Sequence, residues 1–322
     1  MLNALSKKVI SGELLNRHEA LLLAETAQER LEELFSEAEK IKNTFRGDTV
    51  DLCAIVNAKS GACPEDCLYC AQSSKNRADI EIFPFIGKEA ILKHAGEAQK
   101  GGARHFSIVT SGRGPNKEEL KEIAEILGEL KKMGLGTCAS LGILAKDELC
   151  YLRDHGLDRL HNNLETSERF FPFICTTHGI SDKIRTLEAA RSVGIAACSG
   201  GIFGMGETWQ DRIDLAFTVR ELDVVSMPVN FLNPIKGTRL DHLPMLRPDE
   251  ALKIISIMRF ILPRNEIRIC GGRVQTLGDL HPMIFRAGAD SMMTGNYLVT
   301  NGRSYEDDLQ MIRGLGLRTG VQ

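Results

Sequence analysis

The sequence predicts an α/β fold, a (β/α)8 TIM barrel with an N-terminal helical extension. From residue 50 onward, eight short apolar runs alternate with amphipathic helical segments, a pattern typical of a parallel sheet. Several helical segments end in glycine before the next run, as at Gly134 and Gly194. Eight strands are the number that closes a barrel, whereas an open doubly wound sheet of this length usually has fewer.

Three segments follow from this pattern. Residues 1–48 carry leucines at helical spacing among charged residues and are expected to form a helical cap. Residues 49–317 are expected to form the barrel, and 318–322 a C-terminal tail. The expected strands are 50–56, 106–110, 136–140, 159–165, 196–202, 224–231, 267–270 and 291–294. The expected helices after the cap are 88–100, 117–133, 147–155, 182–193, 209–222, 248–262, 274–287 and 304–315.

Composition favours a cytoplasmic metalloenzyme. Hydrophobic residues make up 43% and charged residues 26% of the chain, as in ordinary globular proteins. The net charge of −3 gives no reason to expect a nucleic-acid or membrane partner. Nine cysteines without an export signal indicate a reducing compartment, where cysteine serves metal binding or catalysis more often than disulfides.

Three cysteines, Cys63, Cys67 and Cys70, have the spacing C-x3-C-x2-C directly after the first apolar run. Thiolates are soft ligands that favour iron–sulfur clusters and zinc. A closed site normally takes four protein ligands, and no fourth Cys or His follows nearby. Three thiolates on a [4Fe–4S] cluster leave one iron open, which predicts a reactive cluster. A zinc knuckle with a distant fourth ligand, or a chance grouping, are the alternatives.

Further polar residues and thiols fall at the carboxyl ends of the expected strands, where barrel enzymes carry their chemistry. Since these strand ends share one mouth of the barrel, the side chains are expected to converge there. They are Thr110, Ser111, Cys138, Asn163, Glu165, Cys198, Gly200, Gly201, Asn230, Arg268 and Cys270.

The cysteine spacing, with Tyr69 before the last cysteine, resembles radical S-adenosylmethionine (SAM) enzymes, and the sequence from Gly61 to Ser74 resembles the biotin synthases among them. The segments 161–167, 198–202, 204–208 and 236–238 agree, so the resemblance covers about residues 30–317. It implies a [4Fe–4S] cluster on the three loop cysteines that binds SAM through its open iron. It further implies a 5′-deoxyadenosyl radical that removes hydrogen from dethiobiotin, and a second cluster in the barrel that donates sulfur.

The resemblance also implies individual roles. Tyr69, Thr110, Ser111, Glu165, Gly200 and Gly201 are expected to contact SAM, and Asn163 and Asn230 to bind dethiobiotin or SAM. Lys183 stands where the family commonly has an arginine that contacts SAM, and Arg185 is a possible substitute. For the two asparagines a loop-capping role is the structural alternative, and for the two glycines a tight turn.

The sequence departs from the family at the second cluster. The better-known pattern is a [2Fe–2S] cluster on three cysteines and one arginine; Cys138, Cys198 and Arg268 match it, but the third cysteine position reads Ser107. Cys270 is an additional cysteine on the same strand face as Arg268. Cys138, Cys198 and Cys270 fall on the third, fifth and seventh expected strands, and alternate strands of a barrel contribute to one layer, so the three thiols are expected to converge at one level. Either these four residues hold a rearranged [2Fe–2S] cluster, or the three thiolates hold a four-iron cluster whose open iron carries a transferable sulfide. The second hypothesis is favoured, with Arg268 dispensable as a ligand.

Two other functions remain open at this point. One is a radical SAM barrel enzyme without sulfur insertion, similar to a hydrogenase maturase or methylornithine synthase. The other is an iron–sulfur carrier or zinc-binding protein without catalysis. The resemblance implies a flavodoxin- or ferredoxin-type electron donor and a homodimer.

Overall fold

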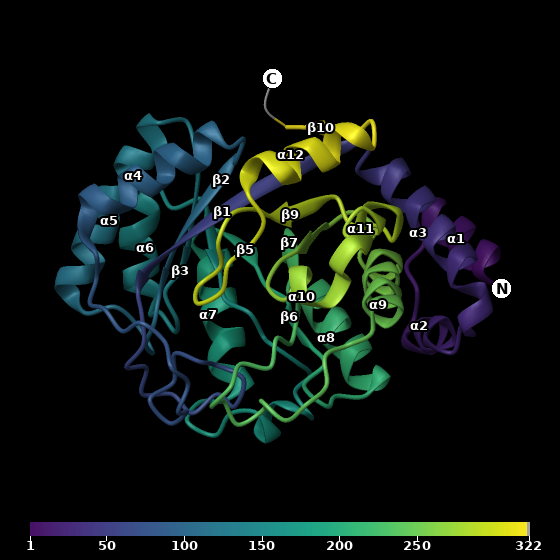
Figure 1. Ribbon diagram of the computed structural model, residues 1–322, viewed down its shortest axis with the longest axis horizontal. Helices are drawn as coiled ribbons and strands as arrows, with labels where there is room; N and C mark the ends of the chain where they lie inside the picture. The colour runs from purple at the N-terminus through teal and green to yellow at the C-terminus, as the bar shows by residue number, and fades with distance from the viewer. Residues whose placement is uncertain (321–322) are drawn as a thin grey trace.

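Eight parallel strand positions close into a barrel in the computed structural model, which describes residues 1–320 (Figure 1). Neighbours pair in the order β1-β2-β3-β4-β5-β7-β8-β9, and β9 pairs with β1 to close the ring. The (β/α)8 prediction is confirmed. The strands are β1 (Thr49–Lys59), β2 (His105–Thr110), β3 (Gly136–Ser140), β4 (Arg159–His161), β5 (Ala196–Cys198), β6 (Gly201–Phe203), β7 (Ser226–Phe231), β8 (Glu266–Ile269) and β9 (Ser291–Met293).

The fifth strand position is divided into β5 and β6, whereas the sequence predicted one run over 196–202. The backbone N–H of Gly200 donates to Asn163 Oδ1 at 3.1 Å. β6 then pairs with β7 further along. The expected strand 159–165 ends early at His161, and Glu165 adopts a left-handed conformation with φ of 72°.

Helices cover the outside of the barrel (Figure 1). They are α4 (Gly87–Lys100), α5 (Lys117–Lys132), α6 (Lys146–Asp154), α7 (Ile180–Ser192), α8 (Trp209–Glu221), α9 (Pro248–Ile261), α10 (Arg273–Leu277), α11 (Met283–Arg286) and α12 (Tyr305–Gly314), with 3-10 turns η2 (Phe171–Phe173) and η3 (Gly278–Leu280). The expected helix 274–287 is broken, because Gly278 has φ of 50° and Pro282 removes a backbone donor.

The N-terminal segment forms α1 (Leu2–Ile10), α2 (Arg17–Ala24), η1 (Gln28–Arg30) and α3 (Leu31–Phe45). Asn16 starts α2 by accepting from the backbone of Glu19 at 2.9 Å. α3 packs on α9, and α2 on α8 and α9, so this segment covers one flank of the barrel. At the other end of the chain, where a tail was expected, β10 (Arg318–Thr319) pairs with the first residues of β1; residues 321–322 lie outside the described residues.

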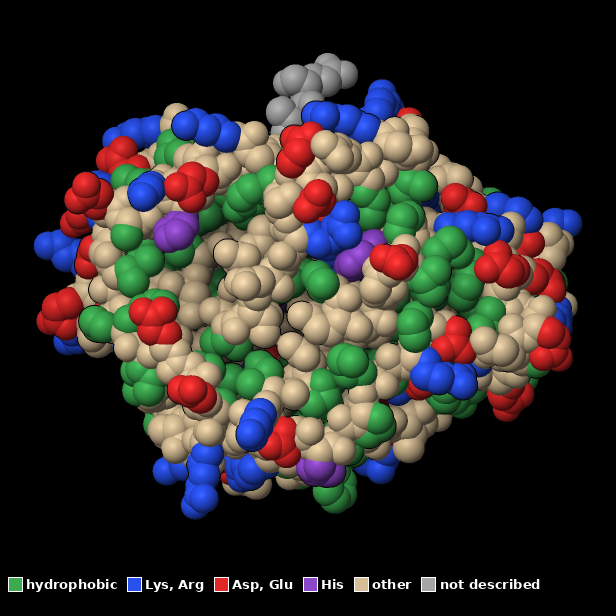
Figure 2. Space-filling model, viewed as in Figure 1, with side chains coloured by type: hydrophobic (Ala, Val, Ile, Leu, Met, Phe, Trp, Pro, Cys, Tyr) green, Lys and Arg blue, Asp and Glu red, His purple; other side chains and the backbone are tan. Residues whose placement is uncertain are grey.

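Two apolar cores flank the barrel wall. One joins β7, β8 and α9 to the N-terminal helices, and the other joins β1–β3 to α4–α6. Figure 2 shows acidic and basic side chains interspersed over the outer part of the face in view. Among the described residues, the helices are all too short or too polar to span a bilayer.

Candidate active site

The cysteine loop leaves the barrel through an irregular strand end. Pairing between β1 and β2 shifts between Asn57 and Lys59, just before the loop, and such a bulge re-aims a strand. Gly61 follows with φ of 72°, and a Cβ there would lie 2.6 Å from Ile82. Only glycine fits this turn without strain. The N–H of Cys63 then donates to the carbonyl of Gln72 at 3.1 Å, which closes the loop on itself.

The three loop thiols share this closed segment. The Asn76 amide donates to the carbonyls of Cys67 at 3.1 Å and Cys70 at 2.8 Å, so one side chain fixes the turn between them. All three cysteines are partly exposed. A donor set of three accessible thiols with a fixed backbone suits a cluster whose fourth iron is reached from outside.

Glu165 lies near the cysteine loop and has a carboxylate oxygen without a hydrogen-bond partner among the described residues. This atom, Oε2, is buried. Burial raises the pKa of this carboxyl, and the charge of Lys183 and a hydrogen bond from Tyr69 offset only part of that cost. Buried polar atoms are nearly always paired in native proteins. A hydroxyl group of a bound ligand would pair with this oxygen, as the predicted contact between Glu165 and SAM requires.

Lys183 and Arg185, both on α7, differ in exposure. Lys183 is half-buried, and its charge acts on the carboxyl of Glu165 and the thiol of Cys67. The Arg185 side chain is 66% exposed and pairs with Asp182 of its own helix. Lys183 is therefore the better candidate of the two, and contact of either residue with SAM stays a prediction.

Thr110 and Ser111 connect the end of β2 to the cysteine loop. Thr110 is the last residue of β2 and pairs with Lys59 beyond the bulge. The Ser111 hydroxyl donates to the Gly61 carbonyl at 2.7 Å. The pair is therefore next to the loop, and Ser111 already has a structural partner.

The two asparagines tie neighbouring strand ends together. Asn163 accepts from Gly200, and the Asn230 amide donates to the Gly201 carbonyl at 3.1 Å. A Cβ at Gly200 would lie 1.9 Å from the Pro228 oxygen, and a Cβ at Gly201 would collide with backbone too. Close backbone packing therefore requires both glycines, and the ligand roles of these four residues stay predictions.

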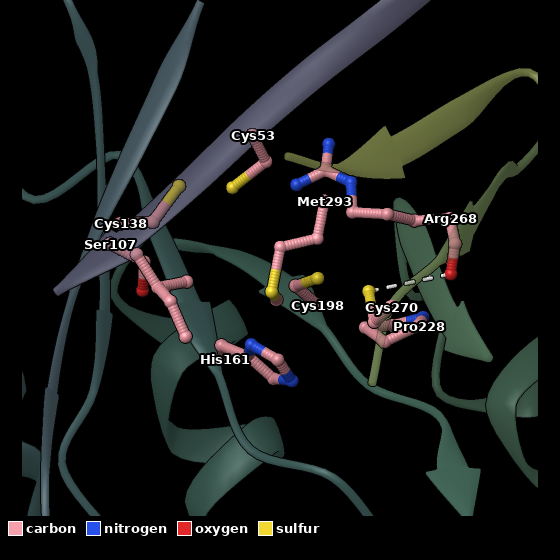
Figure 3. A pocket seen from close by; sticks show the side chains of 10 residues that line it. Cys53, Ser107, Cys138, His161, Cys198, Pro228, Arg268, Cys270 and Met293 are labelled. Atoms are coloured by element: carbon pink, nitrogen blue, oxygen red, sulfur yellow. Dashed lines mark hydrogen bonds between the residues drawn. The ribbon is translucent and has the colours of Figure 1, made fainter. Parts of the chain in front are cut away.

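Inside the barrel, the strands converge on a small cavity (Figure 3). Each strand position of the barrel contributes at least one lining side chain, and the cysteines point inward. Cys138, Cys198 and Cys270 meet there, as predicted from their places on alternate strands. The lining residues are Cys53, Ile55, Ser107, Cys138, His161, Cys198, Pro228, Arg268, Cys270 and Met293.

Cys53 of β1 is the one cysteine of this cavity that the sequence did not indicate as a site residue. A hydrogen bond from Cys138 and the charge of Arg268 lower the pKa of Cys53 to about 6 and leave the pKa of Cys138 raised. Burial raises the pKa of Cys198 to about 11 and that of Cys270 as well. Alternate strands of a barrel contribute to one layer, and this rule, which placed the other three cysteines together, applies to the first strand as well. The sequence could therefore have indicated Cys53.

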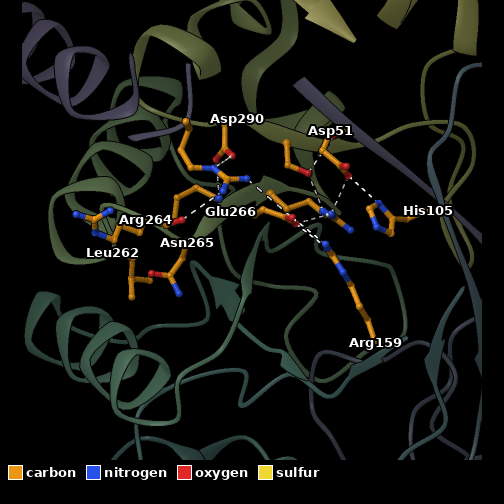
Figure 4. Close-up of polar contacts among 12 residues, drawn as sticks. Asp51, His105, Arg159, Leu262, Arg264, Asn265, Glu266 and Asp290 are labelled. Atoms are coloured by element: carbon orange, nitrogen blue, oxygen red, sulfur yellow. Dashed lines mark hydrogen bonds and ion pairs between the residues drawn. The ribbon is translucent and has the colours of Figure 1, made fainter. Parts of the chain in front are cut away.

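Arg268 closes the floor of the cavity. Its Nη2 donates to Asp51 at 3.0 Å and Glu266 at 2.8 Å, and its Nε to Ser291 at 2.8 Å. Arg159 forms a bidentate pair with Glu266 (Figure 4). Burial opposes the charge of Arg268, but the thiolate form of Cys53 and these carboxylates outweigh it and hold the pKa of Arg268 above its usual range. Beyond the network lies a polar cavity of about 380 Å³ lined by Asp51, Glu266 and Arg159.

The segment after η2 also reaches the cysteine loop, which the sequence did not indicate. Cys175 Sγ lies 3.7 Å from Cys67 Sγ and 3.3 Å from His178 Nδ1. Hydrogen bonds from Cys67 and His178 lower the pKa of Cys175 to about 4. No fourth Cys or His follows the loop nearby in the sequence, but the fold brings Cys175 and His178 beside it, as a distant additional ligand would require.

The barrel and the cysteine loop define the class of protein. The model of the Radical SAM superfamily matches residues 58–219, and that of the Biotin and Thiamin Synthesis associated domain matches residues 228–318. The methylornithine synthase PylB has a TM-score of 0.86 at 20% identity, covering 98% of this chain and 97% of that one. The hydrogenase maturase HydG of Carboxydothermus hydrogenoformans has a TM-score of 0.82 at 17% identity, covering 99% of this chain and 79% of that one. These two structures share the fold alone.

Closer relatives are found by sequence. Biotin synthase of Thermodesulfovibrio yellowstonii is 52% identical over 284 residues, which is 88% of this chain and 90% of the relative. Biotin synthase of Pelotomaculum thermopropionicum is 46% identical over 318 residues, covering 98% and 99%. The chain belongs to the biotin synthase family, within the radical SAM enzymes. The resemblance drawn from the sequence is confirmed.

Proposed function

We propose that this chain converts dethiobiotin to biotin by inserting sulfur, with SAM as co-substrate. The observation that carries the proposal is the presence of two separate thiol sets in one barrel of this family. The loop set is Cys63, Cys67 and Cys70, and the barrel set is Cys138, Cys198 and Cys270 with Cys53 beside them. Sulfur insertion needs a sulfur-donating cluster near the substrate, and the second set can supply its ligands.

The loop residues hold and orient the first cofactor pair. Cys63, Cys67 and Cys70 would bind a [4Fe–4S] cluster, which supplies the electron that cleaves SAM to methionine and a 5′-deoxyadenosyl radical. Glu165, with its unpaired Oε2, would accept a hydrogen bond from a ribose hydroxyl of SAM. Lys183 would pair with the carboxylate of SAM. The strand ends around Asn163 and Asn230 would hold dethiobiotin and exclude water from the reacting carbons.

The barrel set would hold the cluster that supplies the inserted sulfur. We favour a four-iron cluster on Cys138, Cys198 and Cys270 with an added sulfide, over a [2Fe–2S] cluster that includes Arg268. Two carboxylates keep the Arg268 guanidinium protonated, and a protonated guanidinium has no lone pair to offer a metal. Cys53 is the competing ligand for the fourth iron. Mössbauer spectra of the wild type and of Cys53→Ser distinguish these arrangements, and two irons at this site would exclude the four-iron version.

The deciding experiment incubates reconstituted protein anaerobically with SAM, a reductant and dethiobiotin. We expect both 5′-deoxyadenosine and biotin. Deoxyadenosine without biotin favours a radical SAM enzyme without sulfur insertion, and absence of deoxyadenosine favours a carrier or zinc protein.

We further propose a flavodoxin or ferredoxin as electron donor, a homodimer, and a cytoplasmic location. Reduction of the loop cluster by such a donor and the molar mass of the holoprotein in solution test the first two. Nine free cysteines and a cofactor sensitive to oxygen support the third.

A further inference from the structure

A group of soft ligands that includes only one loop cysteine lies beside the cysteine loop. The ligand atoms of Cys67, Cys175 and His178 all lie within 4.8 Å of one another. Cys175 is 3% exposed, and the His178 side chain is 6% exposed. Cys175 and His178 have no part in the function proposed above.

The spacing of the two sulfurs matches coordination of a single metal ion. In a tetrahedral site with metal–sulfur bonds of about 2.3 Å, two thiolates are about 3.8 Å apart. Cys67 Sγ and Cys175 Sγ are 3.7 Å apart. Cys175 is therefore placed to share a metal with Cys67, and not to ligate a different iron of a cluster.

The imidazole of His178 has the carboxylate partner that metal-binding histidines usually have. Its Nδ1 lies 2.5 Å from Glu65 Oε2 and 3.3 Å from Cys175 Sγ, and its Nε2 lies 3.9 Å from the same sulfur, so the ring must turn to direct Nε2 to a metal on Cys175. A carboxylate on one ring nitrogen fixes the tautomer and leaves the other nitrogen free to bind a metal. Thr177 donates to the same Glu65 oxygen at 2.5 Å, which fixes the carboxylate in turn.

Backbone contacts hold the two segments in this register. The N–H of Leu68 donates to the Ile174 carbonyl at 2.9 Å. Asp66 Oδ1 accepts from the N–H groups of Thr176 at 2.8 Å and Thr177 at 3.1 Å. The same oxygen accepts from the Cys175 thiol at 3.3 Å. These contacts hold Cys67 and Cys175 side by side before any metal arrives.

We propose that, in the chain without its loop cluster, Cys67, Cys175 and His178 bind one thiophilic divalent cation, with Fe²⁺ as the physiological ion. Binding releases the thiol protons to solvent and changes no oxidation state. Because Cys67 belongs to both sites, the mononuclear site and the loop cluster are mutually exclusive. The site then serves as the entry point for the first iron of the cluster, and Zn²⁺, which binds such ligands more tightly, blocks assembly there. This inference rests on the proposed function only in treating Cys67 as a cluster ligand.

Co²⁺ tests the site, because tetrahedral thiolate–Co²⁺ centres absorb strongly in the visible range. The full-length chain, stripped of iron and sulfide under anaerobic conditions, is titrated with Co²⁺. We expect the wild type to bind one more Co²⁺ per chain than Cys175→Ser or His178→Gln. Glu65→Gln should weaken this site by roughly 10-fold, as loss of an outer carboxylate usually does. Cys150→Ser, a partly exposed cysteine of α6, is the matched control and should behave as wild type.

Because Cys63 and Cys70 can bind Co²⁺ together with Cys67, the proteins are compared in a Cys63→Ser/Cys70→Ser background. The barrel thiols contribute equally there, so the difference isolates the proposed site. Assembly of the loop cluster with iron and sulfide should release the extra Co²⁺ from the wild type. Equal Co²⁺ stoichiometry and affinity in wild type, Cys175→Ser and His178→Gln would overturn the proposal. Circular dichroism checks the folding of each variant. If a ligand variant misfolds, the Co²⁺ affinity of Glu65→Gln is compared with that of the wild type instead. The titration uses neither SAM nor dethiobiotin, so failure to form biotin leaves its result intact.

Discussion

The two thiol sets occupy one barrel, yet solvent reaches them very differently. Each loop cysteine is partly exposed, on a segment that hydrogen-bonds both to itself and to residues 174–178. In the barrel, Cys53, Cys138, Cys198 and Cys270 are between 1% and 5% exposed. Below them, Arg268 and two carboxylates separate the thiols from the polar cavity at the other end.

This contrast indicates what each set can exchange. An accessible three-thiol site can take and release a ligand as large as SAM in every turnover. A sealed site protects sulfide from water and oxidants, but a sulfide that leaves it is replaced slowly. The loop is therefore suited to repeated use and the barrel to a single delivery of sulfur per loading.

The largest expected effect separates the two sets directly. Cys70→Ser should abolish both deoxyadenosine and biotin, because a loop with two thiols cannot hold the first cluster. Cys198→Ser should abolish biotin while deoxyadenosine still forms. Both products are measured by chromatography after anaerobic incubation with SAM, reductant and dethiobiotin.

Cys150→Ser serves as the control for thiol replacement as such, since Cys150 lies on α6 away from both sets. Full biotin formation by Cys198→Ser or by Cys270→Ser would remove the corresponding thiol from the sulfur-donating site.

The next effect concerns the floor of the barrel. Arg268→Met leaves Asp51 and Glu266 buried without this cation, and breaking a buried ion pair usually costs about 3–5 kcal/mol. Because Arg159 still pairs with Glu266 and His105 with Asp51, we expect about 3 kcal/mol, the lower end of that range. The free energy of unfolding in urea measures it.

Arg318 offers a matched control at the surface. Arg318 pairs with Asp48, but both side chains are more than half exposed, so Arg318→Met should leave the unfolding midpoint unchanged. Equal midpoints for Arg268→Met and the wild type would show that the network does not stabilise the floor.

The contrast between the sets also explains what the sequence could predict. The barrel and the loop motif depend on patterns local in the chain: alternating runs, glycine-ended helices and three cysteines within eight positions. The convergence of Cys138, Cys198 and Cys270 followed from strand parity. Cys53 obeys the same parity, but as a cysteine in an apolar run it is also typical of core filling.

Contacts between segments far apart in the chain could not be predicted from the sequence. Cys175 is 108 positions from Cys67, and only the path of the chain after η2 places the two sulfurs in contact. The break between β5 and β6 depends on the Asn163 side chain, which takes a backbone N–H that a strand ladder would use. Such side-chain competition leaves no periodic signal.

A smaller effect is expected beside the loop, at Glu165. Burial raises its pKa, so the folded chain holds the proton more tightly than the unfolded chain does. The contribution of Glu165 to stability therefore falls as the pH rises from the ordinary pKa of glutamate through the raised one. Glu165→Gln removes this cost and should raise the melting temperature at pH 7, with a flatter pH dependence across that window.

The same variant should bind SAM about 10-fold more weakly, because a charged acceptor of a ribose hydroxyl is lost. Calorimetric binding to the reconstituted protein measures this. A variant that is more stable and binds SAM as tightly as wild type would mean that Glu165 is not a SAM ligand.

The smallest effect distinguishes the two basic residues of α7. Lys183→Ala should weaken SAM binding about 3-fold, the size of a partly screened charge interaction, because its ammonium acts on Glu165 and the loop. Arg185→Ala should leave SAM affinity unchanged, since this side chain points to solvent and pairs with Asp182. Binding isotherms at low and high salt measure both, and the Lys183 effect should shrink with salt. A salt-sensitive loss in Arg185→Ala together with none in Lys183→Ala would mean that α7 turns its other face to the cofactor once SAM is bound.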